Sequence, residues 1–364
     1  MRIDADPSKA WEMKSFKHDR ILTTCKFGPS GDALFAGSFD GKIYRWATET
    51  GERSVVGSHV TWISAILPGP ANRIYSADFQ GNVHAWELGK PEAAWTIERA
   101  HPGWLKAFAI SPDGTLLATG ARDGVVRLWK AADGTPVKEL KGHARDVYSA
   151  AFHPDGRSLT SGDYDGKILH WDVASGTLVR TLEAPSLVTR DPDFLCDVGG
   201  VRALAFDGKG GRLAASGLRD AKSNTFCPGA PSAIVFDWET GKPMTTVKVK
   251  DEKIDGAMTA LRFLADGTLV GCAEGQSYGA ISFWKPGQAE PFHTINSQSL
   301  YEVDVRPDGM ALVGAAFTSI GSGGNGRGKG DYVPNGGTLR LFGLFEKPAA
   351  PKPPPKTPAP KKQG

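Results

Sequence analysis

Four histidines followed by carboxylates are the residues whose types and spacing best suit catalysis. His18, His59, His101 and His143 recur at intervals of 41, 42 and 42 residues. A histidine beside a carboxylate is the usual general acid–base pair of hydrolases. Here, however, each histidine recurs with the repeat, and a repeated residue with its partner in the same repeat indicates a structural role. No Ser-His-Asp, Cys-His or paired-carboxylate arrangement stands apart from the repeat, so the sequence predicts a protein that is not an enzyme.

A glycine-rich segment, residues 321–326, matches the G-x-G-x-x-G pattern of dinucleotide sites. The stretch 323–329 nearly matches a phosphate-binding loop, but Gly330 stands where that loop needs Ser or Thr to bind Mg²⁺. Both motifs require a strand before and a helix after them, and here another strand follows. We therefore expect no nucleotide and no other cofactor, and a flexible loop whose Arg327 contacts an acidic partner.

The four cysteines show no metal-ligand spacing, so no metal site is expected. Cys25 and Cys272 fall in strand patterns and are expected in the core. Cys196 and Cys227 fall in loops expected on one face, where a disulfide would form only in an oxidising compartment.

A tryptophan repeat accompanies the histidine repeat. Trp46, Trp86, Trp129 and Trp171 recur at intervals of 40, 43 and 42 residues. The stretches 105–140 and 141–182 can be aligned as strand, Pro-Asp-Gly turn, strand, Asp-Gly turn, strand ending in Trp, turn and strand. The turns use residues that fix φ or permit positive φ. Such a period of about 40–45 residues indicates an array of four-stranded units.

The repeat resembles the WD40-repeat family, of the type found in bacterial proteins, from residue 10 to residue 345. Blade 4 carries the most complete set of family residues, Gly142-His143, Ser161, Asp165 and Trp171-Asp172. The resemblance implies a hydrogen-bonded tetrad of histidine, hydroxyl residue, aspartate and tryptophan in each complete blade. The implied tetrads are His143, Ser161, Asp165 and Trp171 in blade 4, and His101, Thr119, Asp123 and Trp129 in blade 3. Blade 1 has Ala36 in place of the hydroxyl residue, and blade 2 has Gln80 in place of the aspartate.

The predicted fold class is therefore all-β: a seven-bladed WD40 β-propeller closed by the N-terminal strand, with a disordered C-terminal tail. The last recognisable strand, 338–342, is the third of blade 7, and Trp11 to Phe16 supplies the missing fourth strand. Closure of this kind removes both free sheet edges. We expect residues 1–346 to form the propeller and the Pro/Lys-rich residues 347–364 to form the tail.

The second half of the chain contains four insertions relative to the repeat. In a propeller, connections between blades and turns between second and third strands lie on the same side, the top face. Loops added there are either functional or neutral additions to an exposed surface. The insertions are 184–200, 218–232, 274–279 and 317–337.

The second residue of each innermost strand should line the mouth of the central channel. Alignment on the turn prolines places Thr23, Trp62, Lys106, Tyr148, Arg202, Thr259 and Tyr301 there. The resemblance implies that this position often supplies aromatic side chains that hold a peptide ligand, and exposed aromatics and arginine are common hot-spot residues. The predicted partner-binding residues are Trp62, Lys106, Tyr148, Arg202, Tyr301 and Arg327.

Charge and hydropathy narrow the function classes. The net charge is +3, but the last 18 residues hold five lysines and no acid, which leaves 38 basic and 40 acidic residues, or −2, on the body. A nucleic-acid site would place its positive charge on the folded body, so none is expected there. No stretch approaches the ~20 apolar residues of a membrane span, and the N-terminus has no apolar signal region. We therefore expect no membrane association and a cytoplasmic monomer.

Two functions remain. The favoured one is a non-enzymatic interaction scaffold that binds a protein or peptide on its top face. The alternative is an enzyme or small-molecule sensor with a pocket under the blade 5–7 loops, which would require converging ionisable groups.

Overall fold

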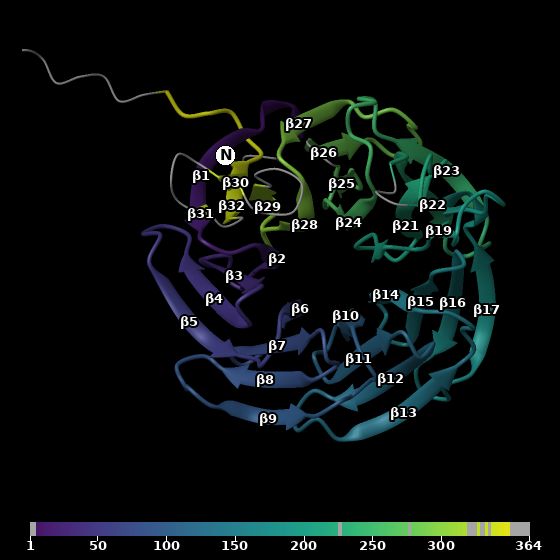
Figure 1. Cartoon of the computed structure of the whole chain (residues 1–364), viewed down its shortest axis with the longest axis horizontal. Coiled ribbons are helices and arrows are strands. Elements are labelled where there is room, and N and C mark those ends of the chain that lie inside the picture. The colour runs from purple at the N-terminus through teal and green to yellow at the C-terminus, as the bar shows by residue number, and fades with distance from the viewer. Residues whose placement is uncertain are drawn as a thin grey trace, which may run out of the picture.

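Seven four-stranded antiparallel sheets are arranged as blades around a central axis in the computed structural model (Figure 1). The structure describes residues 5–224, 228–275, 278–318, 326–327, 332–333 and 336–349. The predicted all-β, seven-bladed propeller is confirmed. The proposed division into residues 1–346 and a tail stays a prediction, because residues 350–364 lie outside the described part.

In blades 1 to 6 the strands follow chain order from the axis outward. Blade 1 consists of β2 (Leu22–Phe27), β3 (Ala33–Ser38), β4 (Lys42–Ala47) and β5 (Arg53–Ser58). Blade 2 consists of β6 (Ile63–Pro68), β7 (Arg73–Asp78), β8 (Val83–Glu87) and β9 (Ala93–Ile97). Blade 3 consists of β10 (Leu105–Ile110), β11 (Leu116–Ala121), β12 (Val125–Lys130) and β13 (Pro136–Lys141). Blade 4 consists of β14 (Val147–Phe152), β15 (Ser158–Asp163), β16 (Lys167–Asp172) and β17 (Leu178–Glu183).

The second half of the ring repeats this order until the last blade. Blade 5 consists of β20 (Ala203–Phe206), β21 (Arg212–Arg219), β22 (Ala230–Asp237) and β23 (Pro243–Lys248). Blade 6 consists of β24 (Met258–Phe263), β25 (Leu269–Ala273), β26 (Gly279–Trp284) and β27 (His293–Ser297). Blade 7 consists of β28 (Leu300–Val305), β29 (Ala311–Thr318), β32 (Gly336–Gly343) and β1 (Trp11–His18). The remaining short elements are η1 (Pro7–Lys9), η2 (Pro185–Leu187), β18 (Val188–Thr189), β19 (Val198–Gly199), β30 (Gly326–Arg327) and β31 (Tyr332–Val333).

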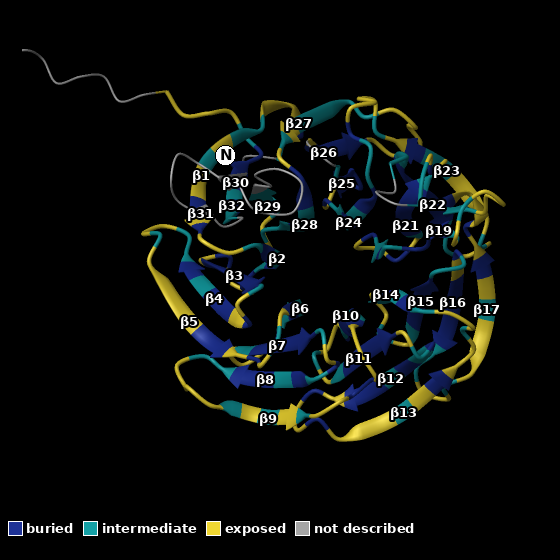
Figure 2. Cartoon of the chain, in the orientation of Figure 1, coloured by how far each residue is buried: buried dark blue, intermediate teal, exposed yellow. Residues whose placement is uncertain are grey.

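The hydrophobic core lies between the blades. Every residue of β3 is buried, whereas the fourth strand β13 is largely exposed, and Figure 2 shows this gradient as blue second and third strands inside yellow outer strands. Trp171 of blade 4 packs in one cluster with Ala118 and Leu128 of blade 3. Strands buried on both faces must be apolar nearly throughout, which explains their weak alternation in the sequence.

The N-terminal strand closes the ring, as predicted. β1 pairs antiparallel with β32, with Trp11 opposite Gly343 and His18 opposite Gly337, two residues beyond the predicted end (Figure 1). Glu12 accepts a hydrogen bond from Arg340 Nε at 3.0 Å across this pair. The outer edge of β32 is therefore covered by the opposite end of the chain.

A charged cluster inside the channel ties blades 6, 7 and 1 together. Glu302 of β28 contacts Lys26 of β2 and lies 3.2 Å from Arg262 Nη2 of β24. Arg262 Nε also donates to Asp304 at 2.7 Å. Asp304 and Glu302 hold the pKa of Arg262 above its ordinary value, although burial alone would lower it. Ion pairs in the channel thus stabilise the closure of the ring in addition to the β1–β32 pairing at the perimeter.

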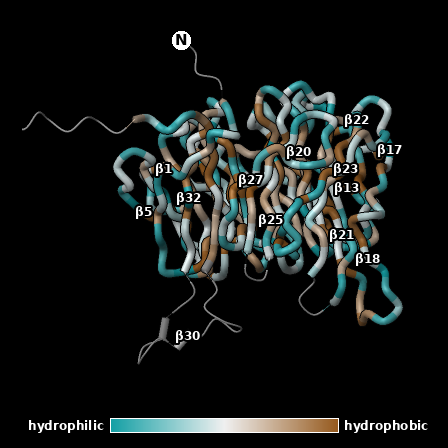
Figure 3. The backbone as a smooth tube through the Cα atoms, turned by 90° about the horizontal axis from the view of Figure 1, so that it is seen from above, coloured by the Kyte–Doolittle hydropathy of each residue, from teal (hydrophilic) through white to brown (hydrophobic). Residues whose placement is uncertain are grey.

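The described parts of the insertions project from one face, seen at the lower edge of Figure 3, while the chain leaves β32 toward the tail on the opposite side. The β21–β22 pairing extends to Arg219 opposite Ala230, and the β29–β32 pairing extends to Thr318 opposite Gly336. A small separate core of Val198, Leu218, Ala221, Ala257 and Phe194 joins the 184–200 insertion to the 218–232 insertion. We keep the name top face for this side of the ring.

Candidate binding surface

The tetrad of blade 3 contains all four predicted residues. His101 Nδ1 lies 2.9 Å from Asp123 Oδ1, and His101 Nε2 lies 2.8 Å from Thr119 Oγ1. Trp129 Nε1 donates to the same hydroxyl at 2.8 Å. Burial lowers the pKa of His101 against the opposing effect of Asp123. The ring is thus a buried and fully bonded link, which is a structural role.

In blade 4 the predicted aspartate is wrong. His143 Nδ1 lies 2.7 Å from Asp163 Oδ2, while the predicted Asp165 forms an ion pair with Arg190 at 3.3 Å. The other predicted members are in place, since Ser161 Oγ lies 2.7 Å from His143 Nε2 and accepts from Trp171 Nε1 at 2.8 Å. Asp163 is the last residue of β15, and its second oxygen accepts the backbone N–H groups of the following turn. In blade 3 the equivalent position is Ala121, so Asp123 supplies the carboxylate there.

Blade 2 repeats the blade 4 arrangement, and this also corrects the expectation of a missing aspartate. His59 Nδ1 lies 3.0 Å from Asp78 Oδ2, so Gln80 leaves no gap in the tetrad. Ser76 Oγ lies 2.7 Å from His59 Nε2 and accepts from Trp86 Nε1 at 2.8 Å. In blade 1, where Ala36 replaces the hydroxyl residue, Ser38 Oγ lies 3.5 Å from His18 Nε2, and Arg53 Nη1 lies 2.9 Å from His18 Nδ1, the atom that faces the carboxylate in the other blades.

The ring at the channel mouth contains six of the seven expected residues, and the alignment in blade 2 was wrong. β6 pairs Ile63 with Asp78 just as β2 pairs Leu22 with Ser38, so Ser64 is the equivalent of Thr23. Alignment on Pro68 caused the error, because Pro68 is the last residue of β6 and the turn proline is Pro70. The second residues of the first strands are therefore Thr23, Ser64, Lys106, Tyr148, Thr259 and Tyr301, and in blade 5 the expected Arg202 directly precedes β20.

Trp62 lies just before β6, in an aromatic row of Phe39, Trp62, Phe79 and Trp104. Phe39 stacks on Trp62 with ring centroids 4.3 Å apart and planes at 4°. Trp62 contacts Phe79 edge-on at 5.4 Å, and Phe79 stacks on Trp104 at 4.5 Å. Trp62 and Trp104 remain 46% and 43% exposed. The row therefore presents large apolar rings to solvent in a fixed arrangement.

Backbone geometry positions this row. Phe79 N donates to Trp62 O at 3.1 Å, and Phe39 N donates to Ile21 O at 3.0 Å, so the residue leaving each second strand lies beside the residue before the first strand. Sequence reasoning missed Phe39, Phe79 and Trp104. The available signal was an aromatic residue directly before the Asp-Gly or Gln-Gly turn, as in Phe39, Phe79 and Tyr164.

Beside Trp104 the row continues into a cationic pocket of ≈ 450 Å³, lined by Pro102, Gly103, Trp104, Lys106, Arg122, Arg145, Asp146, Val147, Tyr148 and Tyr164. Lys106 Nζ lies 3.6 Å from the Trp104 ring centroid and 3.9 Å from that of Tyr148. Arg202 lies 4.6 Å over the same tyrosine, and Arg145 lies 5.0 Å over Tyr164. Burial, followed by the charge of Arg202, lowers the pKa of Lys106 to about 7.

Of the predicted partner-binding residues, the structure thus brings Lys106, Tyr148 and Arg202 together. Tyr301 lies elsewhere on the ring, stacked on Phe317 at 4.6 Å. The side chain of Arg327 lies outside the described residues, as does Cys227, so the loop contact and the pairing of Cys227 with the exposed Cys196 stay predictions.

Glu274, at the end of blade 6's second strand, was also missed. Burial raises the pKa of this carboxyl group, and Arg202 and Lys106 oppose the shift. Glu274 in turn contributes to the raised pKa of Tyr301, about 12, whose main cause is burial. The charge of Glu274 therefore acts both on Arg202 and Lys106 and on Tyr301.

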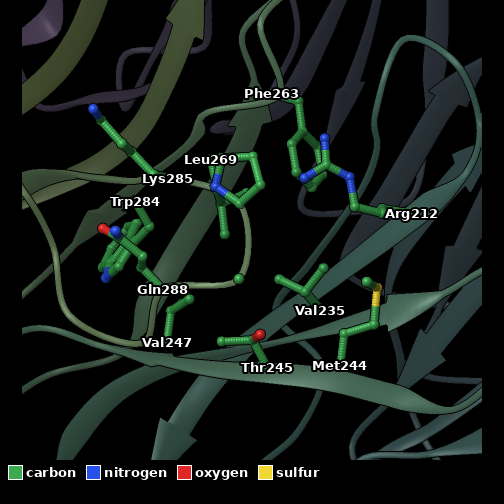
Figure 4. A pocket seen from close by; sticks show the side chains of 13 residues that line it. Arg212, Val235, Met244, Thr245, Val247, Phe263, Leu269, Trp284, Lys285 and Gln288 are labelled. Carbon is green, nitrogen blue, oxygen red and sulfur yellow. The ribbon is translucent and has the colours of Figure 1, made fainter.

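A separate pocket of ≈ 320 Å³ lies between blades 5 and 6 (Figure 4). Its wall is largely apolar, with Val235, Phe263 and Trp284, and its charged residues are Arg212 and Lys285. Gly267 and Lys285 follow the first and third strands of blade 6, so the pocket opens away from the top-face insertions. Within the described residues no cluster of three or more His, Cys, Asp or Glu side chains could hold a metal ion. This pocket therefore does not lie under the described parts of the blade 5–7 loops.

Comparison with known proteins agrees with the repeat and the fold. The WD domain, G-beta repeat profile matches residues 11–47, 94–130 and 134–172. These three segments therefore match the WD40 repeat, and the chain folds as a seven-bladed β-propeller.

The similarity to individual proteins is partial. The chain is 35% identical over 95 residues to small ribosomal subunit protein RACK1 of Caenorhabditis elegans, covering 25% of this chain and 28% of that protein. It is 25% identical over 150 residues to the periodic tryptophan protein 2 homolog of Dictyostelium discoideum, covering 40% of this chain and 16% of that protein. It is 30% identical over 137 residues to apoptotic protease-activating factor 1 of Rattus norvegicus, covering 37% of this chain and 11% of that protein.

The matches thus span less than a third of these relatives' lengths. The relatives are eukaryotic and give no support to a bacterial type of repeat. Among the described residues, no helix has the length and apolar character needed to cross a membrane.

Proposed function

We propose that this propeller is a non-enzymatic interaction scaffold that binds a protein or peptide on its top face. The observation that carries the proposal is the aromatic row, in which Trp62 and Trp104 are each almost half exposed yet held by stacked neighbours. Rings fixed before binding lose little side-chain entropy when a partner covers them. Such a row gives affinity without any catalytic group.

The distribution of exposed apolar side chains supports the same face. Among the described residues the large exposed hydrophobics fall into two groups. Val55, Val137, Leu178, Val179 and Met244 lie on fourth strands at the perimeter, one or two to a blade. Val60, Trp62, Trp104, Leu195 and Tyr278 lie in top-face connections. Scattered exposed hydrophobics are ordinary, whereas a group on one face is typical of a binding surface.

The remaining features of the proposal rest on composition. The body without its last 18 residues has 38 basic and 40 acidic residues, which favours a protein ligand over nucleic acid. We further propose a monomer that acts in the cytoplasm, with residues 1–346 as the binding unit and 347–364 as a disordered tail.

Affinity purification with quantitative mass spectrometry tests the function. Full-length protein, Trp104→Ala and Met244→Ala would be used as baits in the same cell extract. Met244 is the matched control, because it is a 55% exposed hydrophobic residue on the perimeter strand β23. Partners lost with Trp104→Ala and kept with Met244→Ala support the proposal. Specific partners that survive Trp104→Ala and Trp62→Ala overturn it.

A further inference from the structure

The geometry points to a more specific ligand, an inference that rests on the proposed function. We propose that the cationic pocket binds an acidic side chain of a partner peptide. An aromatic or aliphatic residue of the same peptide, within about four positions, then covers the aromatic row. The top face would thus recognise a short acidic–hydrophobic motif.

The first argument is the state of the cations in the pocket. Several other partly buried cations of the described chain have carboxylate partners, as in Lys26–Glu302, Arg212–Asp207 and Arg262–Asp304. Lys106, Arg145 and Arg202 instead contact aromatic rings, and no described carboxylate forms a salt bridge with them or with Arg122. Lys106, Arg122 and Arg145 line the pocket with a single carboxylate, Asp146. The pocket is therefore complementary to an anion.

The second argument is an unsatisfied donor. Arg202 lines the channel next to the pocket and lies over the Tyr148 ring, and its buried Nε has no hydrogen-bond partner among the described residues. The Ser64 hydroxyl, at the equivalent position of blade 2, is buried without a partner as well. Buried donors are rarely left unpaired. A carboxylate only accepts hydrogen bonds and can take two from one guanidinium group, so it matches Arg202 better than a neutral side chain does.

The third argument is the position of Lys106. It lines both the pocket and the central channel of ≈ 530 Å³, as does Tyr148, so the two spaces meet at these side chains. Its ammonium group is sandwiched between two rings and partly desolvated, which lowers its pKa to about 7. A bound carboxylate would favour the charged form of Lys106. The pocket is thus arranged to gain more from an anion than an ordinary surface lysine would.

The fourth argument is the connection between pocket and row. Trp104 belongs to both, so one peptide can contact them together. Successive ring centroids from Phe39 to Trp104 are 4.3, 5.4 and 4.5 Å apart. An extended peptide advances about 3.3 Å per residue, so the row spans about four residues.

Single-stranded nucleic acid also combines stacking with negative charge. Such ligands need a groove that follows several phosphates, however, whereas here the unpaired cations converge on one pocket. The acidic peptide is therefore the ligand that the charge distribution favours.

A phage-displayed random 12-residue peptide library, selected on the full-length protein, tests the motif. The expected result is enrichment of Asp or Glu within four positions of Trp, Phe or Leu. The enriched peptide would then be synthesised with a fluorescent label and titrated by anisotropy. Replacing its acidic residue by the matching amide should weaken binding by about 10- to 100-fold, as should Arg202→Met in the protein.

Two further variants keep the result interpretable. Arg145→Met removes an exposed cation of the pocket rim and should weaken binding by about 5- to 10-fold without affecting the fold. Lys42→Met is the matched control, because Lys42 is an exposed cation at the start of β4 on the same face. Its Kd should stay within about twofold of the unchanged protein.

The outcomes separate the two proposals. Top-face peptides without acidic enrichment, or unaffected by Arg202→Met and Arg145→Met, overturn the acidic motif and leave the scaffold function standing. Peptides that bind Trp62→Ala and Trp104→Ala unchanged overturn both. A phosphoserine version that binds where the carboxylate version does not, or a 12-nucleotide single strand that displaces the peptide at equal concentration, overturns the carboxylate assignment.

Discussion

His143 Nδ1 lies 2.7 Å from Asp163 Oδ2, and the two side chains are only 0% and 1% exposed. This contact joins the connection between blades 3 and 4 to the end of β15. Asp163 Oδ1 accepts the backbone N–H groups of Asp165 and Lys167 at 3.0 and 2.9 Å. One carboxylate therefore holds a loop and a turn together, and removing it leaves several buried donors without an acceptor.

The first prediction is that Asp163→Ala lowers the free energy of unfolding by ~1.5–3 kcal/mol, the usual range for a hydrogen bond to a charged group. Asp165→Ala should cost at most about 1 kcal/mol, because its ion pair with the exposed Arg190 is largely screened. Urea denaturation of the two variants measures the difference. In blade 2, Asp78→Ala should behave like Asp163→Ala, and Gln80→Ala should have little effect. Similar losses for Asp163→Ala and Asp165→Ala would contradict this assignment.

Sequence could identify the tetrads but not every member. Asp163 and Asp165 are two residues apart at the end of one strand, and such side chains point to the same side. Spacing alone therefore could not choose between them, whereas the strand end at Asp163 does. The blade 2 register failed for a similar reason, because Pro68 and Pro70 both fit the turn pattern. The ring order and the closing strand were predictable, since each blade repeats local signals and contacts only its neighbours.

The aromatic row was not predictable in the same way. Phe39 of blade 1 stacks on Trp62 of blade 2, and Phe79 of blade 2 stacks on Trp104 of blade 3. These pairs depend on the distance and rotation between adjacent blades, which no single repeat encodes. The positions of the insertions were predictable from the spacing, but the small core that joins two of them was not.

The second prediction concerns closure. Deleting residues 1–18 removes β1 and exposes the edge of β32, together with the core around Phe16 and Leu339. An exposed apolar edge promotes pairing between chains, so the shortened protein should form large aggregates in size-exclusion chromatography with light scattering. Deletion of residues 350–364 is the control and should leave a single monodisperse peak. A soluble, folded protein without β1 would show that the edge strand is dispensable.

The third prediction is acid instability caused by His84, which is partly buried, and His170, which is buried. Burial, followed by the nearby His59 ring, lowers the pKa of His84 to about 4, and burial followed by Arg180 lowers that of His170 to about 4. Both pKa values lie below the ordinary 6.5 of an unfolded chain. Between pH 6.5 and 4 the unfolded chain therefore binds more protons than the folded protein. The free energy of unfolding is then highest above pH 6.5 and decreases as the pH falls toward 4. Neither Nδ1 has a partner among the described residues.

Urea titrations at pH 7.5, 6, 5 and 4 measure this dependence. His84→Gln with His170→Gln should flatten the decline of stability between pH 6.5 and 4, whatever its effect at neutral pH. An unchanged slope would mean that other groups cause the acid sensitivity.

The fourth prediction separates packing from binding among the tryptophans. Trp171 is 1% exposed between blades and donates to Ser161, so Trp171→Ala should cost ~3–5 kcal/mol of folding stability. Trp62→Ala removes a ring that is 46% exposed and should cost much less. Its effect should appear instead as a loss of about 2 kcal/mol or more in partner binding. Thermal unfolding and partner titration of both variants provide the comparison, and a similar fall in Tm would show that Trp62 is a packing residue.

The fifth prediction is that Lys106→Met stabilises the protein while it weakens binding. Burial lowers the pKa of Lys106 from its ordinary 10.5 to about 7, so the folded state disfavours the charged form. Between these values the unfolded chain binds more protons, and the stability of the unchanged protein therefore rises with pH from 7 to 10.5. Methionine fills the space between Trp104 and Tyr148 without a charge and makes favourable sulfur–aromatic contacts. At pH 7.5 the variant should gain roughly 1 kcal/mol, because the lost cation–π contacts offset part of the relieved desolvation. The gain over the unchanged protein should shrink toward pH 10.5.

Binding should change in the opposite direction at the same residue. In the unchanged protein, affinity for the acidic peptide should fall as the pH rises through about 7, because Lys106 loses the proton that pairs with the carboxylate. In Lys106→Met the affinity should be lower throughout and lack this step, while Lys42→Met should retain it. Anisotropy titrations between pH 6 and 9, combined with urea denaturation over the same range, measure both effects. A variant that is less stable and equally pH-dependent in binding would show that Lys106 supports the fold and does not contact the ligand. The expected result is that Lys106 destabilises the free protein and strengthens the complex, as a charged group in a preorganised anion site does.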